Sequence, residues 1–211
     1  MLRGTKIIGL IGLALLLFTL SFVYVGPMPS FASPRDTVVL IKSKTGSLGS
    51  GVVIAPGKII TAFHVVGVTD FVEYKGHQVP FTVLYGDSKQ DYAIIQAIGV
   101  ECPCARLSFK RPAIDEELVK IGFGLFPSVQ VQNRTDGRFM GLAKQDEQRW
   151  MIVTSPVAPG DSGGGIFVKH WGIYYLVGIV SAVSIANPMG FPDMVNHLGL
   201  AVPIEVLHYG K

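Results

Sequence analysis

After Pro34 the sequence consists of short apolar runs separated by turn residues. The runs are rich in valine, isoleucine, tyrosine and phenylalanine, and glycine, proline or aspartate stands at their ends, which is typical of β-strands. Few windows of ~12 residues have a helical period, and only Ile204–Tyr209 is expected to form a short terminal helix. The sequence therefore predicts an all-β fold. The expected strands are Thr37–Lys42, Gly51–Ile54, Lys58–Thr61, Asp70–Tyr74, Gln78–Tyr85, Tyr92–Ala97, Leu118–Phe123, Ser128–Gln132, Arg138–Leu142, Trp150–Thr154, Gly165–Val168, Tyr174–Val183 and Leu200–Val202.

These strands form two sets, which are divided by the charged segment 108–117 (SFKRPAIDEE). This segment contains Pro112, and proline with charged residues is typical of a connection. The expected domains are residues 36–110 and 111–211, which have similar sizes and no sequence repeat between them. Strands at this spacing favour a barrel or a sandwich.

The N-terminus is a separate apolar segment, since Ile7–Val25 contains no charged residue and follows Arg3 and Lys6. Its length of 19 residues suits a membrane anchor, whereas a signal peptide has an apolar region of roughly 7–15 residues. The sequence SFA that ends at Ala32 nevertheless resembles a signal-peptidase site. Residues 1–32 are thus expected to be an anchor with a linker or a cleaved signal peptide. A buried core helix of a soluble domain is the third alternative, and it is disfavoured because such a helix rarely runs for 19 residues without a polar face.

The basic residues before the apolar run favour an extracytoplasmic location for the rest of the chain. The protein is then either anchored in the membrane by residues 7–25 or secreted after cleavage near Ala32. Without Arg3 and Lys6, 16 basic residues stand against 15 acidic ones, and no run of lysine or arginine remains. The charge pattern therefore predicts no binding to nucleic acid.

Metal and cofactor motifs are not expected in this chain. The sequence contains no HExxH motif and no cluster of cysteine and histidine, so we expect neither a metal site nor a cofactor. The glycine-rich segment Gly46–Gly51 matches no phosphate-binding fingerprint. Cys102 and Cys104 are separated only by a proline, and at this spacing they are poorly placed to bond to each other. We expect two thiols in a loop or strand, with an intermolecular bridge as the alternative in an oxidising compartment.

The segment SPVAPGDSGGG, Ser155–Gly165, contains a serine followed by three glycines. Glycine is used where the backbone takes a positive φ or approaches another group closely, so this segment is expected to be a tightly shaped loop. A serine becomes a nucleophile only beside a base that a third group orients. His64 follows an expected strand and Asp91 precedes another, with Asp87 as a nearby competitor.

Four segments together carry a family resemblance: GSGVVIAPGKIITAFHVV, DYAIIQ, PGDSGGG and LVGIVSAVS. The chain resembles the chymotrypsin/trypsin-like serine proteases of the PA clan, and in particular the small bacterial or viral trypsin-like and HtrA-type protease domains. This resemblance spans roughly residues 37–202 and implies two six-stranded antiparallel β-barrels, here preceded by one N-terminal hydrophobic helix. It also implies a protein or peptide substrate. Membrane association would come from the N-terminal segment if it is retained, and the oligomeric state stays open.

The resemblance also implies the roles of the site residues. Ser162 would be the nucleophile, His64 its general base and Asp91 the group that orients the imidazole. The backbone N–H groups of Gly160 and Ser162 would form the oxyanion hole. In the digestive relatives the acid at the position of Asp161 pairs with a new N-terminus that cleavage of a zymogen releases. No matching activation sequence precedes the first expected barrel here. We therefore expect Asp161 to find another partner, such as backbone amides.

The resemblance also implies the substrate-binding residues, which are Pro156, Ser181, Ala182 and Val183. Pro156 would lie at the base of the primary specificity pocket, where an acid would select lysine or arginine. Val183 would narrow the pocket where open-pocket relatives have glycine, which predicts a preference for small or medium apolar residues.

The leading hypothesis is a secreted or membrane-tethered serine endopeptidase. A processing protease with one dedicated substrate, of viral or phage type, and a non-catalytic binding module on the same fold are the alternatives.

Overall fold

The structure is a computed structural model and describes residues 33–126, 129–145, 147–181 and 198–207. The description below concerns the unit Ala32–Lys211. The expected N-terminal helix and the predicted domain 1–32 lie outside the described residues. In the described ranges, no helix reaches the length and hydropathy that a membrane crossing requires.

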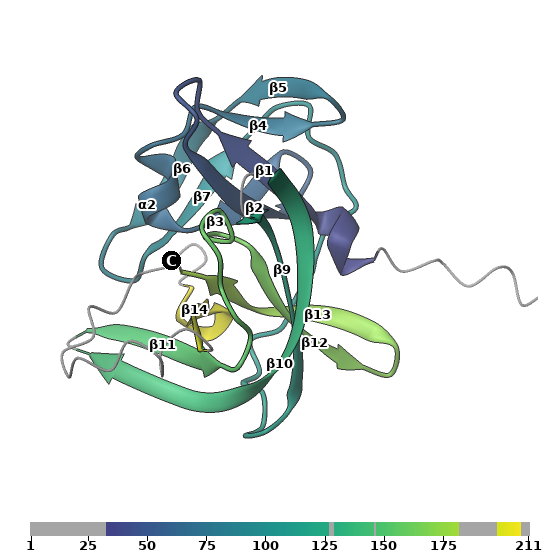
Figure 1. Ribbon diagram of the computed structural model, residues 1–211, viewed down its shortest axis with the longest axis vertical. Coiled ribbons are helices and arrows are strands. Elements are labelled where there is room, and N and C mark those ends of the chain that lie inside the picture. Colours follow the sequence, from purple (N-terminus) through teal and green to yellow (C-terminus); the bar gives the residue numbers. More distant parts are fainter. Residues whose placement is uncertain (1–32, 127–128, 146, 182–197, 208–211) are drawn as a thin grey trace, which may run out of the picture. The chain divides into compact units, whose positions relative to one another are not determined.

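The first half forms a seven-stranded antiparallel sheet in the order β5-β4-β1-β2-β3-β7-β6 (Figure 1). A one-turn 3-10 helix, η1 (Pro34–Thr37), precedes it, and the four-residue helix α2 (Phe63–Val66) follows β3. Strands β1 and β7 are buried at nearly every residue, which explains their continuous apolar sequences. The strands are β1 (Val38–Lys42), β2 (Leu48–Ala55), β3 (Lys58–Thr61), β4 (Phe71–Tyr74), β5 (His77–Pro80), β6 (Thr82–Asp87) and β7 (Tyr92–Gln96).

The second half forms another seven-stranded sheet, in the order β12-β9-β10-β11-β14-β13-β8. An additional pairing of β12 with β13 closes six of these strands into a ring, and β8 runs parallel to β13 outside it. A second 3-10 helix, η2 (Ile204–Val206), follows the last strand. The strands are β8 (Arg106–Leu107), β9 (Glu117–Phe126), β10 (Val129–Gln145), β11 (Gln148–Val153), β12 (Gly165–His170), β13 (Ile173–Val180) and β14 (Gly199–Pro203).

The prediction of an all-β fold is confirmed, with two curled sheets that are compatible with a double barrel. Six strands were expected for each barrel: the first sheet has seven, whereas the ring of the second has six, with β8 outside it. In the first sheet the segment Gln78–Tyr85, expected as one strand, is divided between β5 and β6, which end and begin on either side of Phe81. Pro80 has no N–H to donate to a ladder, so a strand ends there readily. In the second half β8 was not expected, and one strand, β10, stands where Ser128–Gln132 and Arg138–Leu142 were expected as two.

The two sheets share an apolar core. One cluster of buried side chains combines Val52, Ile60 and Tyr92 of the first sheet with Ile121 and Phe167 of the second. Each sheet also has a core cluster of its own. Because burying one such side chain contributes about 1.5–3 kcal/mol, the shared cluster holds the sheets against each other and brings the loops at their junction together.

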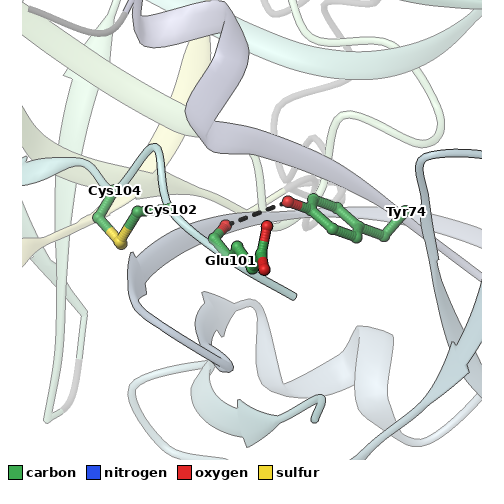
Figure 2. The surroundings of a disulfide bond; sticks show 4 residues. All are labelled: Tyr74, Glu101, Cys102 and Cys104. Atoms are coloured by element: carbon green, nitrogen blue, oxygen red, sulfur yellow. Dashed lines mark hydrogen bonds between the residues drawn. A yellow bond between two sulfur atoms is a disulfide. The ribbon is translucent and has the colours of Figure 1, made fainter. Parts of the chain in front are cut away.

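The connection between β7 and β8 contains a disulfide bond between Cys102 and Cys104 (Figure 2). The prediction that these cysteines would not bond to each other is therefore wrong. Two residues of extended chain span about 7 Å, beyond the reach of a disulfide. Here the chain bends at Pro103, and the two Cα atoms lie 4.5 Å apart, within the normal range.

Candidate active site

His64 and Asp91 lie side by side because their strands are neighbours. His64 is in α2, just after β3, and Asp91 stands immediately before β7, which pairs with β3. The His64 Nδ1 atom is 3.0 Å from each carboxylate oxygen of Asp91, and the His64 backbone N–H donates to Asp91 Oδ1 over 3.0 Å. Asp91 has a φ of 53°, a left-handed conformation that aspartate adopts more easily than most residues.

Asp91 is almost completely buried, with 5% of its surface exposed. The hydroxyl of Ser181, which follows β13 in the second sheet, donates a short hydrogen bond to Asp91 Oδ2. Burial raises the pKa of Asp91, but the hydrogen bonds from His64 and Ser181 outweigh it, so the pKa lies below its ordinary value. The carboxyl group is therefore ionised at neutral pH.

The competing acid, Asp87, has a different role. Its Oδ1 atom accepts hydrogen bonds from the backbone N–H groups of Lys89 and Gln90, over 2.9 and 3.0 Å. This is the capping of a local turn. The structure thus pairs His64 with Asp91.

Ser162 lies in the loop between β11 and β12 and is nearly buried, with 6% of its surface exposed. Ser50 of β2 fixes this loop with two hydrogen bonds and accepts a third from β9. The Ser50 N–H donates to the Ser162 carbonyl over 2.7 Å, and the Ser50 hydroxyl donates to the Gly160 carbonyl over 2.8 Å. The same hydroxyl accepts from the Phe123 N–H over 2.8 Å. A residue of the first sheet therefore holds the loop of the second.

Gly163 allows this close approach. It has a φ of 85°, and a Cβ atom at this position would lie 2.0 Å from the Ser50 carbonyl oxygen and 2.2 Å from Thr61 Oγ1. The Thr61 hydroxyl donates to that same carbonyl over 2.6 Å, and Thr61 is three residues before His64. This chain of contacts places the serine loop against the end of β3.

A second chain of contacts connects Ser162 to Asp91. The Gly163 N–H donates to the Val180 carbonyl over 2.7 Å, and the next residue, Ser181, hydrogen-bonds Asp91. The loop that carries Ser162 is thus connected to the end of β3, three residues before His64, and through Val180 and Ser181 to Asp91. No hydrogen bond joins the His64 ring to the Ser162 hydroxyl, both of which are described. Catalytic hydrogen bonds often form fully only when substrate is bound.

The N–H groups expected to form the oxyanion hole are available. Gly160 has a φ of 93°, and across the described residues neither its N–H nor that of Ser162 donates a hydrogen bond. A Cβ atom at Gly160 would lie 2.4 Å from the carbonyl oxygen of Phe123, so the loop requires glycine there.

Asp161 has partners that the sequence did not reveal. It is fully buried and forms an ion pair with the Lys120 ammonium of β9, whose side chain is 1% exposed. Its carboxylate also accepts from Asn133 Nδ2 over 2.6 Å and from the Ala158 N–H over 2.8 Å. Backbone amides were expected, and only Ala158 fits that expectation. The one signal in the sequence was a lysine inside the apolar run of β9.

Burial lowers the pKa of Lys120, and its pairing with Asp161 offsets only part of that effect. The ammonium thus loses its proton at a lower pH than an ordinary lysine. Once it does, the buried Asp161 carboxylate loses its cation.

The expected specificity residues are only partly described. Pro156 is exposed and Ser181 is buried, whereas Ala182 and Val183 lie outside the described residues. Gly199 of β14 packs closely beside this segment, because a Cβ atom at Gly199 would lie 2.7 Å from the Ser155 carbonyl oxygen and 2.9 Å from Val157 Cγ2. As for metals, the described residues contain no group of three or more histidine, cysteine, aspartate or glutamate side chains that could hold an ion.

The trypsin-like peptidase domain family matches residues 49–179, more than half of the chain and including His64, Asp91 and Ser162. The chain belongs to this family. It is accordingly a serine-type endopeptidase, as the sequence predicted. No curated protein matches the sequence.

Solved structures show the same fold at low identity. The Rv3671c protease of M. tuberculosis, in an inactive form, is 21% identical to the peptidase and superposes with a TM-score of 0.65, covering 83% of this chain and 87% of that one. A serine endoprotease from Yersinia pestis is 21% identical and superposes with a TM-score of 0.64, covering 80% of this chain and 59% of that one. The HtrA-type protease AlgW with a tripeptide is 20% identical and superposes with a TM-score of 0.62, covering 84% of this chain and 60% of that one. The peptidase thus spans about three fifths of the last two chains.

The Lys120–Asp161 pair makes a testable prediction for alkaline pH. Because the pKa of Lys120 is lowered, we expect the rate at which a fluorophosphonate labels Ser162 to decrease as the pH rises. This decrease should occur at a pH below the range in which an ordinary lysine titrates. In Lys120→Arg, whose charge persists, this fall moves to higher pH. Lys120→Met leaves Asp161 buried without a cation and loses about 3–5 kcal/mol of folding stability.

The measurements are labelling rates from pH 7 to 11 and thermal unfolding of each variant. Lys144→Met, which removes a lysine outside this network, is the control and keeps the wild-type profile. An alkaline fall at the same pH in wild type and Lys120→Arg contradicts the role of Lys120.

Proposed function

We propose that the peptidase hydrolyses peptide bonds through a triad of His64, Asp91 and Ser162 and an acyl-enzyme intermediate. The observation that carries this proposal is the fixed His64 ring, whose Nδ1 lies 3.0 Å from both oxygens of an ionised, buried carboxylate. This leaves Nε2 as the basic nitrogen. The contacts through Ser50 and Val180 support the placement of Ser162 beside it.

In the proposed reaction the Ser162 hydroxyl attacks the carbonyl carbon of the scissile bond, and His64 Nε2 takes its proton. His64 then gives this proton to the leaving amine. A water molecule then attacks the carbonyl carbon of the acyl-enzyme, and His64 takes a proton from it. The Ser162 oxygen leaves and regains its proton from His64, which releases the second product. Asp91 keeps the proton on Nδ1 and stabilises the imidazolium that forms.

Negative charge develops on the carbonyl oxygen in both steps, and the N–H groups of Gly160 and Ser162 would bind it. One such donor contributes roughly 2.7–4 kcal/mol in other enzymes. The buried ion pair of Lys120 with Asp161 supports a loop, around Gly160 and Ser162, whose conformation is fixed by side chains of the same chain. We therefore propose that the loop forms without cleavage of the chain to release a new N-terminus.

The architecture belongs to the same proposal. We assign the two curled sheets to two β-barrels, in domains 36–110 and 111–211, with the triad at their junction. The ring that β12 and β13 close supports this assignment for the second domain.

The test of the nucleophile is Ser162→Ala. This variant should lose nearly all turnover of a peptide substrate and all labelling by a fluorophosphonate, since the attacking oxygen is absent, while its thermal unfolding stays close to wild type. Ser88→Ala, which alters an exposed serine outside the site, is the matched control and keeps full labelling.

Undiminished cleavage by Ser162→Ala, or wild-type protein that is folded but takes no label, would overturn the proposal. The second result would favour a binding module. Labelling of Ser162 without cleavage of casein would indicate a processing protease with a dedicated substrate.

For specificity, we propose a preference for small or medium apolar residues on the acyl side of the cut bond. Pro156 carries no charge at the expected base of the pocket, and Val157, which packs close to Gly199, is apolar as well. We expect a peptide library to show this preference and Val157→Ala to shift it toward larger side chains, by up to about 10–200-fold. Cleavage mainly after lysine, arginine or glutamate would contradict it.

For location, we propose that the peptidase acts outside the cytoplasm, tethered by residues 7–25 or released after cleavage near Ala32. The disulfide between Cys102 and Cys104 supports an oxidising compartment. Mass spectrometry of the mature protein distinguishes the two forms: an intact N-terminus in the membrane fraction means an anchor, and a start near Ser33 means a cleaved signal. A full-length chain in the soluble cytoplasmic fraction would refute both.

A further inference from the structure

The disulfide between Cys102 and Cys104 lies in the connection between β7 and β8 and has no role in the proposed hydrolysis (Figure 2). Only Pro103 separates the two cysteines. A disulfide stabilises a fold mainly by restricting the unfolded chain, and it does so least when the loop it closes is short. Stabilisation by this route is therefore a weak explanation for the bond.

Hydrogen bonds to the first sheet fix the connection on both sides of the disulfide. Before it, the Val100 carbonyl accepts from the Gly57 N–H over 2.7 Å. After it, the Ala105 N–H donates to the Val53 carbonyl over 2.8 Å. Neither bond depends on the sulfur atoms, so we expect the backbone to keep its course when the disulfide opens.

The two cysteines differ in exposure. Cys102 is exposed, whereas Cys104 is half-buried and packs against the core cluster of the first sheet. The Tyr74 hydroxyl donates to the Glu101 carbonyl over 3.5 Å, a hydrogen bond drawn as a dashed line in Figure 2. The Glu101 carboxylate is paired with Lys75 Nζ at 3.2 Å. An incoming thiolate therefore meets an accessible sulfur at Cys102, beside a carboxylate whose charge is paired.

We propose that this disulfide is a thiol–disulfide exchange site that accepts electrons from a dithiol at Cys102. One thiolate of the dithiol attacks Cys102 Sγ, the sulfur–sulfur bond breaks, and Cys104 leaves as a thiolate that takes up a proton. The second thiol of the reductant, as a thiolate, attacks the sulfur that joins the reductant to Cys102. Cys102 then leaves and is protonated. Two electrons pass to the protein, and the dithiol is released as a cyclic disulfide.

The first test is a redox titration of the folded full chain in mixtures of reduced and oxidised dithiothreitol. After an acid quench and alkylation, mass spectrometry counts the thiols, and far-ultraviolet circular dichroism of parallel samples reports on the sheets. We expect the pair to open while the sheets stay folded. Two free thiols in protein prepared without reductant, or a bond that opens only as the sheets unfold, would overturn the proposal.

The second test compares Cys104→Ser with Cys102→Ser, each of which has one thiol. Exposure governs access to a thiol, so we expect oxidised glutathione to modify Cys102 in the first variant at least about tenfold faster than Cys104 in the second. Equal rates, or faster reaction at Cys104, would contradict attack at Cys102. Ser162→Ala should give the same redox titration as wild type, which keeps this result separate from the outcome for hydrolysis.

Discussion

The carboxylate of Asp91 accepts hydrogen bonds from both sheets at once, from His64 in the first and from Ser181 beside the second. A buried carboxylate is costly unless polar partners surround it, so neither half alone offers Asp91 the environment it has here. The apolar cluster that the sheets share brings the partners together, and the hydrogen bonds fix their positions. The second half therefore completes, through Ser181, the surroundings of a carboxylate that orients an imidazole of the first half.

The loop that holds Ser162 has two kinds of support. From the first sheet, Ser50 donates to the carbonyl groups of Gly160 and Ser162, and from within the second, Lys120 and Asn133 bind Asp161. The first support sets where the loop lies relative to His64. The second sets its internal conformation, and thus the direction of the N–H groups that would bind the substrate carbonyl. A displaced loop and a collapsed loop are separate ways to lose activity.

Local patterns were enough to predict the all-β fold, because short apolar strands and the turn residues at their ends are readable from sequence. The pairing of His64 with Asp91 was an expectation from the family resemblance, since the local pattern alone left Asp87 as a competitor. Long-range partners were not. Lys120 stands 41 residues before Asp161, and no local rule connects them. The polar segment Asn133–Gly137 was expected to separate two strands, but it continues β10 because β9 pairs with it throughout. The bend at Pro103 that allows the disulfide was equally invisible in the spacing.

The close contact of Gly163 with Ser50 and Thr61 bears on how such chains are recognised. This glycine is required by packing, since any side chain would push the two sheets apart at their junction. A relative that had lost its nucleophile or its base would still need the glycine to fold. The glycine after the serine is thus required by the fold and not only by catalysis. We expect an inactive relative with the same fold to keep this glycine.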